Sequence, residues 1–382
     1  YLLAAILMGF SLYRLRMPLW MATAVFVPLV GVIIWFGQSA PLTMPALGPF
    51  RPQLVWNGVI LGYCFLASIL PMWMLLQPRG YLGGFFLYLT LAAGIVGLFL
   101  GGDAIQYPAF LGWTSQRGFP LFPMLFVTVA CGACSGFHGI VSSGTTSKQI
   151  WKEPDCRLVG YGGMLLEGLV AVIALATVMI LAPTDPAVQQ SPDRIYANGL
   201  SHFVEQFGIN RDLARSFALL AFATFIYDTL DVATRLGRYV FQELTGWQGA
   251  WGRIGATLGT LSLPALCVSR TMTDAAGQVV PAWKVFWTIF GTSNQLLAAL
   301  TLLTIAVWLR KTGRPWRLAA IPACFMLTMT LWSLGLLMRP WLTNLAAGRW
   351  SVDWIAAIAA VLMGLAVLVV REALPHIRRV RG

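Results

Sequence analysis

Long runs of apolar residues fill most of this chain, and short polar, proline- or glycine-containing connections separate them. A helix needs about 20 apolar residues to cross roughly 30 Å of hydrocarbon. By this measure the pattern predicts an all-α polytopic membrane protein with about eleven transmembrane helices. Their expected ranges are 1–13, 18–37, 54–76, 81–101, 120–143, 158–182, 212–234, 252–268, 284–308, 316–338 and 351–371. The longest polar connection, 183–211, is predicted to be a loop.

The amino-acid composition also indicates a membrane-embedded chain. Hydrophobic residues make up 58% of it and charged residues only 10%, whereas a soluble domain has about 25% charged residues. We expect one transmembrane domain over 1–382 and a lipid bilayer around it. Dinucleotide, phosphate-loop and nucleophile-elbow motifs are missing from the sequence, so neither an enzyme nor an organic cofactor is expected. The three histidines are far apart in the sequence, which also argues against a metal site.

Basic residues divide unevenly between the two ends of the predicted helices. The net charge is +12, which membrane proteins acquire by keeping Lys and Arg in cytoplasmic loops; no nucleic-acid partner is needed to explain it. Of the 26 Lys and Arg residues, we assign seventeen to the side that carries Arg14, the 310–317 connection and the C-terminus. The positive-inside rule places that side, and the C-terminus, in the cytoplasm.

The segment 131–148 loses its apolar character before a membrane span should end. Polar, glycine-rich helix is tolerated in a bilayer where it lines a cavity or packs against other helices. If the segment is one helix, Ser135, His138, Ser142 and Thr146 share a face. Such a helix, when it breaks, offers hydroxyls and carbonyls to a small cation or a carboxylate. The predicted pathway residues here are Ser135, His138, Ser142, Ser143, Thr145 and Thr146.

Ionisable and amide side chains inside other predicted spans extend the list of candidate functional residues. Glu167 and Asp228 lie within apolar segments, where an unpaired carboxylate is costly and a protonated one can carry a proton. Asp231 and Arg235 have the i, i+4 spacing of a helical charge pair. The predicted gating or charge-pair residues are Lys148, Asp231 and Arg235, and the amides predicted to bind substrate in the span 284–308 are Asn294 and Gln295.

At these residues the chain resembles the carbon starvation protein A family. The resemblance is carried by Ala130–Thr146, Gly160–Glu167, Leu230–Arg235 and Phe290–Ala298, which occur in the family's order, and Pro71–Arg79 fits as well. It implies an inner-membrane carrier of pyruvate, linked in some members to peptides, with proton-coupled uptake. It also implies an inverted-repeat, leucine-transporter-type core. The family's N-terminal Gly-His-His-Phe region is not found here, so a missing N-terminal segment or a second chain is expected to complete that core.

Together these observations predict a secondary transporter of the bacterial inner membrane that imports a small carboxylate, with pyruvate as the first candidate, together with a proton. One alternative is a peptide or amino acid carrier that uses sodium at the Ser/Thr cluster. An alternative of another class is a structural membrane subunit that requires a partner chain.

Overall fold

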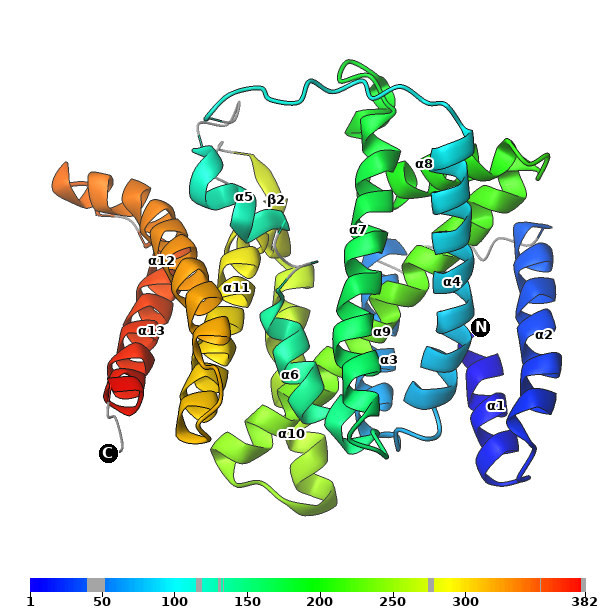
Figure 1. Ribbon diagram of the computed structural model, residues 1–382, viewed down its shortest axis with the longest axis horizontal. Coiled ribbons are helices and arrows are strands. Elements are labelled where there is room, and N and C mark those ends of the chain that lie inside the picture. Colours follow the sequence, from blue (N-terminus) through cyan, green and yellow to red (C-terminus); the bar gives the residue numbers. More distant parts are fainter. Residues whose placement is uncertain are drawn as a thin grey trace. The chain divides into compact units, whose positions relative to one another are not determined.

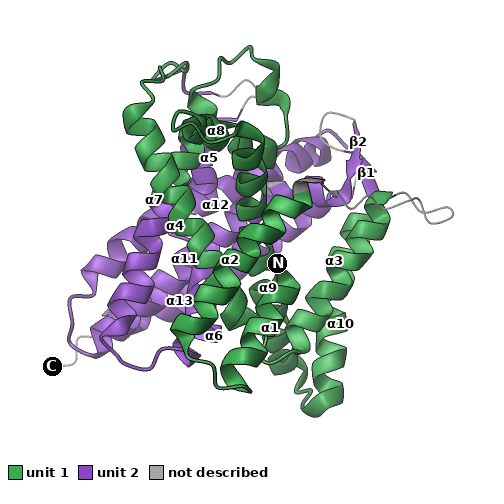
Figure 2. Ribbon diagram, turned by 90° about the vertical axis from the view of Figure 1, so that its right-hand side faces the viewer, with its two compact units in different colours: residues 1–109, 169–269 green, residues 110–168, 270–382 purple. Residues whose placement is uncertain are grey.

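A computed structural model describes residues 1–39, 52–114, 119–129, 132, 134–273, 278–350 and 352–378, and its helices are labelled in Figure 1. The chain separates into two compact units, which are distinguished by colour in Figure 2. Unit 1 comprises residues 1–109 and 169–269, and unit 2 comprises residues 110–168 and 270–382.

Unit 1 is built from helices. They are α1 (Leu2–Tyr13), α2 (Leu19–Ser39), α3 (Pro52–Ile69), α4 (Leu76–Leu100), most of α7 (Gly163–Met179), the 3₁₀ turn Pro186–Gln189, α8 (Pro192–Glu205), α9 (Arg211–Thr245) and α10 (Gly249–Ser269). The ends of the long helix α9 follow from local sequence. The Asn210 side chain accepts hydrogen bonds from the first-turn amides of Asp212 and Leu213, and Gly246 ends the helix in the left-handed conformation at φ +71°.

Unit 2 contains a short hairpin beside its helices. Its helical elements are α5 (Leu121–Val129), α6 (Gly136–Gly144), the 3₁₀ turn Thr146–Lys148, the π-helical stretch Arg157–Gly162 that leads into α7, α11 (Ala282–Lys311), α12 (Arg317–Ala346) and α13 (Trp354–Arg378). Strands β1 (Thr271–Thr273) and β2 (Val279–Pro281) pair antiparallel. A buried cluster from α11, α12 and α13 forms the core, including Leu296, Leu327 and Leu334.

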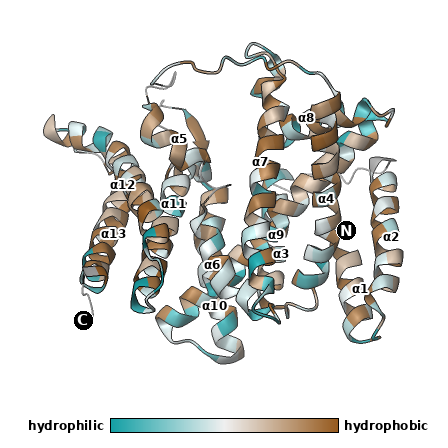
Figure 3. Cartoon of the chain, in the orientation of Figure 1, coloured by the Kyte–Doolittle hydropathy of each residue, from teal (hydrophilic) through white to brown (hydrophobic). Residues whose placement is uncertain are grey.

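The prediction of an all-α polytopic membrane protein is confirmed. Among the described residues, 8 helices are long and apolar enough to cross a membrane. Figure 3 shows hydrophobic colour along α4, α7 and α12. Three of the eleven expected spans are not among these helices. Helices α1 and α10 lie at the expected ranges 1–13 and 252–268, but α1 has only 12 residues, and the 21 residues of α10 are diluted by glycine, serine and threonine. The range 120–143 instead holds two separate helices.

The prediction of a loop over 183–211 is wrong. Helix α8 lies there, and it buries Tyr196, Ala197, Leu200 and Phe203 in the core of unit 1. The helix alternates these residues with polar ones on its other face. A search for uniformly apolar runs overlooks such an amphipathic helix, because its average hydropathy is low.

Helix α4 begins before the expected span 81–101 does. The turn falls at 70–75, and Pro78 occupies the first helical turn, where its missing N–H costs nothing because those amides have no partner within the helix. The earlier start places Arg79 inside an apolar helix rather than in a basic loop.

Candidate functional site

The segment expected to form one polar helix is broken in unit 2. Helix α5 ends at Val129, α6 begins at Gly136, and Ser135 between them is extended at φ −107°, ψ 130°. Thr146 lies beyond α6, in a 3₁₀ turn. The predicted common face of Ser135, His138, Ser142 and Thr146 is therefore wrong, because only His138 and Ser142 belong to the same helix. Cys131, in the predicted helix, lies outside the described residues.

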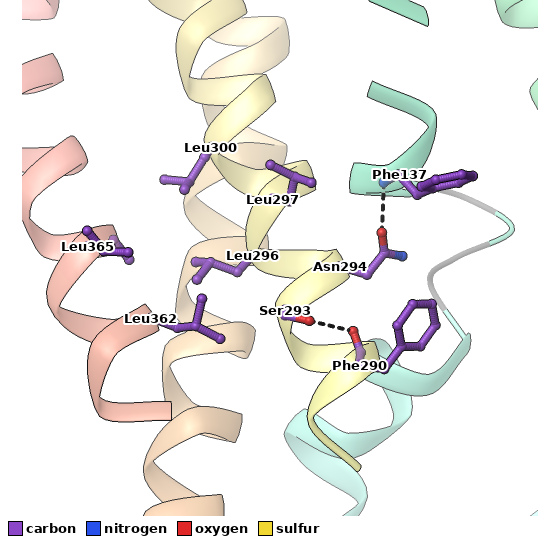
Figure 4. A pocket seen from close by; sticks show the side chains of 10 residues that line it. Phe137, Phe290, Ser293, Asn294, Leu296, Leu297, Leu300, Leu362 and Leu365 are labelled. Atoms are coloured by element: carbon purple, nitrogen blue, oxygen red, sulfur yellow. Dashed lines mark hydrogen bonds between the residues drawn. The ribbon is translucent and has the colours of Figure 1, made fainter. Parts of the chain in front are cut away.

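Asn294 from α11 caps the start of α6. The N-cap residue of α6, Ser135, makes no side-chain capping hydrogen bond. Instead, the backbone amide of Phe137 donates to Oδ1 of Asn294 at 2.7 Å, and Nδ2 of Asn294 donates to Oγ of Ser135 at 3.2 Å. Figure 4 shows the Phe137–Asn294 bond. Ser135 and Asn294, two predicted pathway residues 159 positions apart, are thus brought together and buried.

We expect Asn294→Ala to lower the free energy of unfolding by about 1–2 kcal/mol, because the partly buried amide of Phe137 loses its acceptor. Asn294→Asp keeps an oxygen at this position and should retain most of the stability. Unfolding in detergent, followed by circular dichroism, measures both. Ser293→Ala is the matched control on the same helix, since its hydroxyl donates only to the carbonyl of Phe290. Equal stability of Asn294→Ala and Ser293→Ala would contradict the cap.

A cavity of about 390 Å³ borders the break in unit 2. Figure 4 shows residues that line it, with Asn294 and Phe137 on one side and Leu362 and Leu365 on another. The lining is apolar except at Ser293 and Asn294. Gln295 is fully buried and does not line the cavity. Of the two predicted amides, the structure therefore places only Asn294 at both the break and the cavity.

The predicted hydroxyl cluster on α6 does not converge on one point. Ser142 and Ser143 are exposed and donate to the carbonyls of Gly139 and Ile140. Thr145 is buried and donates to the carbonyl of Val141. Lys148 is exposed in the turn after α6. These bonds stay within the local helix, which is a common way for Ser and Thr to be accommodated in apolar helices.

His138 and Glu167 come together in unit 2. Nε2 of His138 lies 3.2 Å from Oε2 of Glu167, and the two side chains are 37% and 34% exposed. Nδ1 of His138 is buried and finds no hydrogen-bond partner among the described residues. An imidazole and a carboxylate at this separation can share one proton, and the pair is neutral or charged according to how many protons it holds.

A second charged cluster lies inside unit 1. Arg79 of α4 is fully buried and forms ion pairs with Asp228 and Asp231 of α9. Its Nη1 is 2.5 Å from Oδ2 of Asp231, and its Nε donates to Oδ1 of Asp228 at 2.9 Å. The Tyr63 hydroxyl of α3 accepts from Nη1 and donates to Oδ2 of Asp231 at 2.9 Å.

Sequence reasoning missed Arg79 and Tyr63. The signal was available: two aspartates at i, i+3 in an apolar helix require a cation, since isolated buried carboxylates are very costly. The expected partner, Arg235, is instead used elsewhere. Its Nη2 donates to the carbonyls of Ala67 and Leu70 at 2.6 and 2.7 Å, where α3 ends. A guanidinium at a helix C-terminus satisfies carbonyls that have no partner within the helix, so Arg235 is a cap rather than the partner of Asp231.

Within the described part of the chain, no three His, Cys, Asp or Glu side chains come together as metal ligands. The charged groups that the structure assembles are instead suited to binding protons and carboxylates. They are the His138–Glu167 pair in unit 2 and the Arg79 cluster in unit 1.

Known proteins that resemble this chain are named as transporters. A protein from Helicobacter pylori named Peptide transporter CstA is 31% identical over 398 residues, covering 86% of this chain and 57% of the relative. Pyruvate/proton symporter BtsT of Escherichia coli is 28% identical over 402 residues, covering 81% and 55%. A Mycobacterium tuberculosis Peptide transporter CstA is 32% identical over 373 residues, covering 78% and 46%.

The chain spans about half the length of these relatives. No solved structure matches it. The family model described as Carbon starvation protein CstA matches residues 1–193 and 184–333, most of the chain. The order of motifs, the apolar helices and this match lead to one conclusion: the chain belongs to the carbon starvation protein CstA family.

Proposed function

We propose that this protein is a secondary transporter that imports a small carboxylate, with pyruvate as the substrate, together with a proton. The observation that carries the proposal is the His138–Glu167 pair, in which both side chains are about a third exposed and Glu167 lies within the membrane-spanning segment Arg157–Met179. Ionisable groups at such positions are typical of proton pathways. Among the relatives, the one named Pyruvate/proton symporter BtsT favours the same coupling.

The broken segment α5–α6 supplies the proposed substrate pathway. Helix starts at a break in the membrane present amide donors and a positive dipole, which favour a carboxylate. Ser135, Asn294 and His138 lie at this start, and the hydroxyls of Ser142, Ser143, Thr145 and Thr146 continue along the segment. Gln295, the next residue along α11, is fully buried. We assign proton coupling to Glu167 and Asp228, and a gating role at the cytoplasmic end to Lys148.

The proposal extends to the place of action. Multiple apolar helices and family membership make this a multi-pass membrane protein. We propose the bacterial inner membrane, with the C-terminus in the cytoplasm because the basic residues gather on that side. The relatives named as peptide transporters make a peptide the alternative substrate. Peptides and pyruvate both carry a carboxylate, so either substrate needs a cation in the pathway.

Uptake of labelled pyruvate into proteoliposomes that contain the full-length protein tests the proposal. With an inward proton gradient we expect accumulation, and with equal pH on both sides only equilibration, because the gradient is the energy source. Replacing sodium by choline should leave uptake unchanged. Uptake that follows sodium and not the proton gradient would favour an amino acid or peptide carrier, and labelled dialanine would then be the next substrate.

A chain that acts as a structural subunit would give a different result. In mild detergent a second polypeptide would remain bound, and the purified chain would transport only with it. Transport by the single purified polypeptide is the result expected here.

A further inference from the structure

We propose that Arg79 is the cation that binds the carboxylate of the transported substrate, and that this carboxylate and the Asp228 side chain alternate on Arg79. The inference rests on the proposed function, because it supplies the cation that a carboxylate carrier requires. The cluster of Arg79, Asp228, Asp231 and Tyr63 lies entirely within unit 1. The His138–Glu167 pair belongs to unit 2.

The two aspartates are held differently. Asp231 is 2% exposed, and its Oδ2 receives both Nη1 of Arg79 and the Tyr63 hydroxyl. The Asp228 side chain is 34% exposed and is held by Arg79 alone among the hydrogen bonds described for it. Asp231 is therefore the fixed partner that keeps Arg79 in place, and Asp228 is the partner that another carboxylate can replace.

In its contact with Asp228, the Arg79 guanidinium does not make the bidentate pair that a carboxylate allows. Nε and Nη2 form the edge that matches the two oxygens of one carboxylate. Here both nitrogens donate to the single oxygen Oδ1 of Asp228. A substrate carboxylate that reached this edge would accept one hydrogen bond on each oxygen. The exchange therefore gains a bidentate contact, which offsets the loss of the Asp228 contact.

Charge balance then couples the substrate to a proton. In the described ion pairs Arg79 meets two aspartates, so the cluster carries one net negative charge before substrate binds. A substrate anion alone would add a second negative charge in a medium of low dielectric. A proton on Asp228 together with an anion on Arg79 leaves the net charge unchanged, and additional unbalanced charge is costly here. The titratable and charged groups that face Asp228 or its cluster are Tyr1, Tyr63, Cys64, Arg79, Asp231 and Arg235.

The proton-transfer step requires no other reactant. A proton from the aqueous side bonds to an oxygen of Asp228, which ceases to be an anion and is a weak acceptor for Arg79. The substrate carboxylate takes the Nε and Nη2 donors, and the neutral Asp228 carboxyl stays beside it. On release, the carboxylate leaves Arg79, the proton leaves Asp228 for water, and the Arg79–Asp228 ion pair forms again.

The test is a binding titration of the full-length protein, followed by tryptophan fluorescence, with pyruvate and its neutral amide, pyruvamide. Wild type should bind pyruvate and not pyruvamide, with an affinity that falls as pH rises, because binding requires the proton on Asp228. Arg79→Gln should weaken pyruvate binding about 10- to 100-fold, the value of a lost charge-assisted pair. Arg79→Lys should be intermediate, since lysine cannot hold both oxygens. Arg253→Gln, an exposed arginine of unit 1, is the matched control.

Asp228→Asn is the second variant, and it tests the inference independently if Arg79→Gln does not fold. Asparagine imitates the protonated carboxyl, so pyruvate affinity should no longer depend on pH. Pyruvate exchange across the membrane should persist, while accumulation driven by a proton gradient is lost. A folded Arg79→Gln protein with wild-type affinity would overturn the inference, and so would an Asp228→Asn protein whose affinity keeps the wild-type pH dependence.

Failure of the proposed function gives a different pattern. If wild type neither binds nor takes up pyruvate, the same titration with dialanine and its C-terminal amide still examines Arg79. Selective binding of free dialanine that Arg79→Gln abolishes would support carboxylate recognition while pyruvate transport fails. If none of these carboxylates binds to wild type, both proposals fail.

Discussion

Glu167→Gln is expected to abolish accumulation of pyruvate against its gradient. A gradient of one pH unit is worth about 1.4 kcal/mol per proton, or about tenfold accumulation in one-to-one symport. We expect coupling to require both carboxyl groups, Asp228 to bind the proton together with the substrate and Glu167 to relay that proton. Glutamine cannot take up or release a proton, so the internal-to-external ratio should fall from about ten to about one. Glutamine has the size of glutamate and keeps one side-chain oxygen near His138. In the wild-type protein Nε2 of His138 lies 3.2 Å from Oε2 of Glu167. Proteoliposomes with a set pH difference give the ratio directly.

Two comparisons make this result specific. Glu243→Gln changes an exposed glutamate at the end of α9, and it should accumulate pyruvate as wild type does. Pyruvate binding to the Glu167→Gln protein should keep its pH dependence, which the inference above assigns to Asp228. Undiminished proton-driven accumulation by Glu167→Gln would remove Glu167 from the coupling mechanism.

Gly136→Ala is expected to destabilise the protein by about 2–3 kcal/mol, in the upper part of the range of about 1–3 kcal/mol for overpacking a tight contact. Gly136 begins α6 where that helix meets α11. A Cβ atom there would lie 2.6 Å from the backbone nitrogen of Ala298 and 2.6 Å from Cβ of Leu297. Backbone cannot move aside as the end of a long side chain can. The helix would have to shift away from α11, which also draws Phe137 away from the Asn294 cap.

Gly335→Ala serves as the matched substitution in the same unit. Gly335 lies inside α12, and beyond the neighbouring backbone of its own helix no atom of the described residues comes within 4 Å of its Cβ position. Alanine favours a helix over glycine by about 1 kcal/mol, so this variant should be as stable as wild type or more stable. Thermal unfolding in detergent compares the two. If Gly136→Ala and Gly335→Ala melt together, the α6–α11 contact is not tight.

The membrane helices could be predicted because each one is determined by the residues of its own segment. A run of about 20 apolar residues forms a helix in lipid whatever its neighbours are, since backbone groups must be satisfied within the segment. Helices α2 and α11 follow the predicted spans closely, whereas α12 and α13 start within three residues of the predicted positions and continue beyond the predicted ends at 338 and 371. Helix α8 was missed because its stability comes from burying one face in unit 1, and that burial depends on neighbours far along the chain.

Candidate residues could be predicted more reliably than their partners. Glu167, Asp228, Asp231, His138 and Asn294 stand out because polar groups are costly in an apolar segment. Asp231 was expected to pair with Arg235, which is close in sequence. It pairs instead with Arg79, 152 positions away, because Arg235 is held by the end of α3. Pairing over such distances depends on how helices pack, and spacing along one helix cannot specify it.

By itself the sequence determined that this chain is a many-helix membrane protein of the CstA family, and which polar residues need a function or a partner in the bilayer. Hydrophobic run length and the cost of buried polarity act on each segment alone, so they can be read along the chain. Only the tertiary structure decided that Ser135 ends a helix break capped by Asn294, and that one buried arginine joins two aspartates. These contacts join residues that are far apart in the sequence. They depend on the relative free energies of alternative partners, which are set when the helices of each unit pack together.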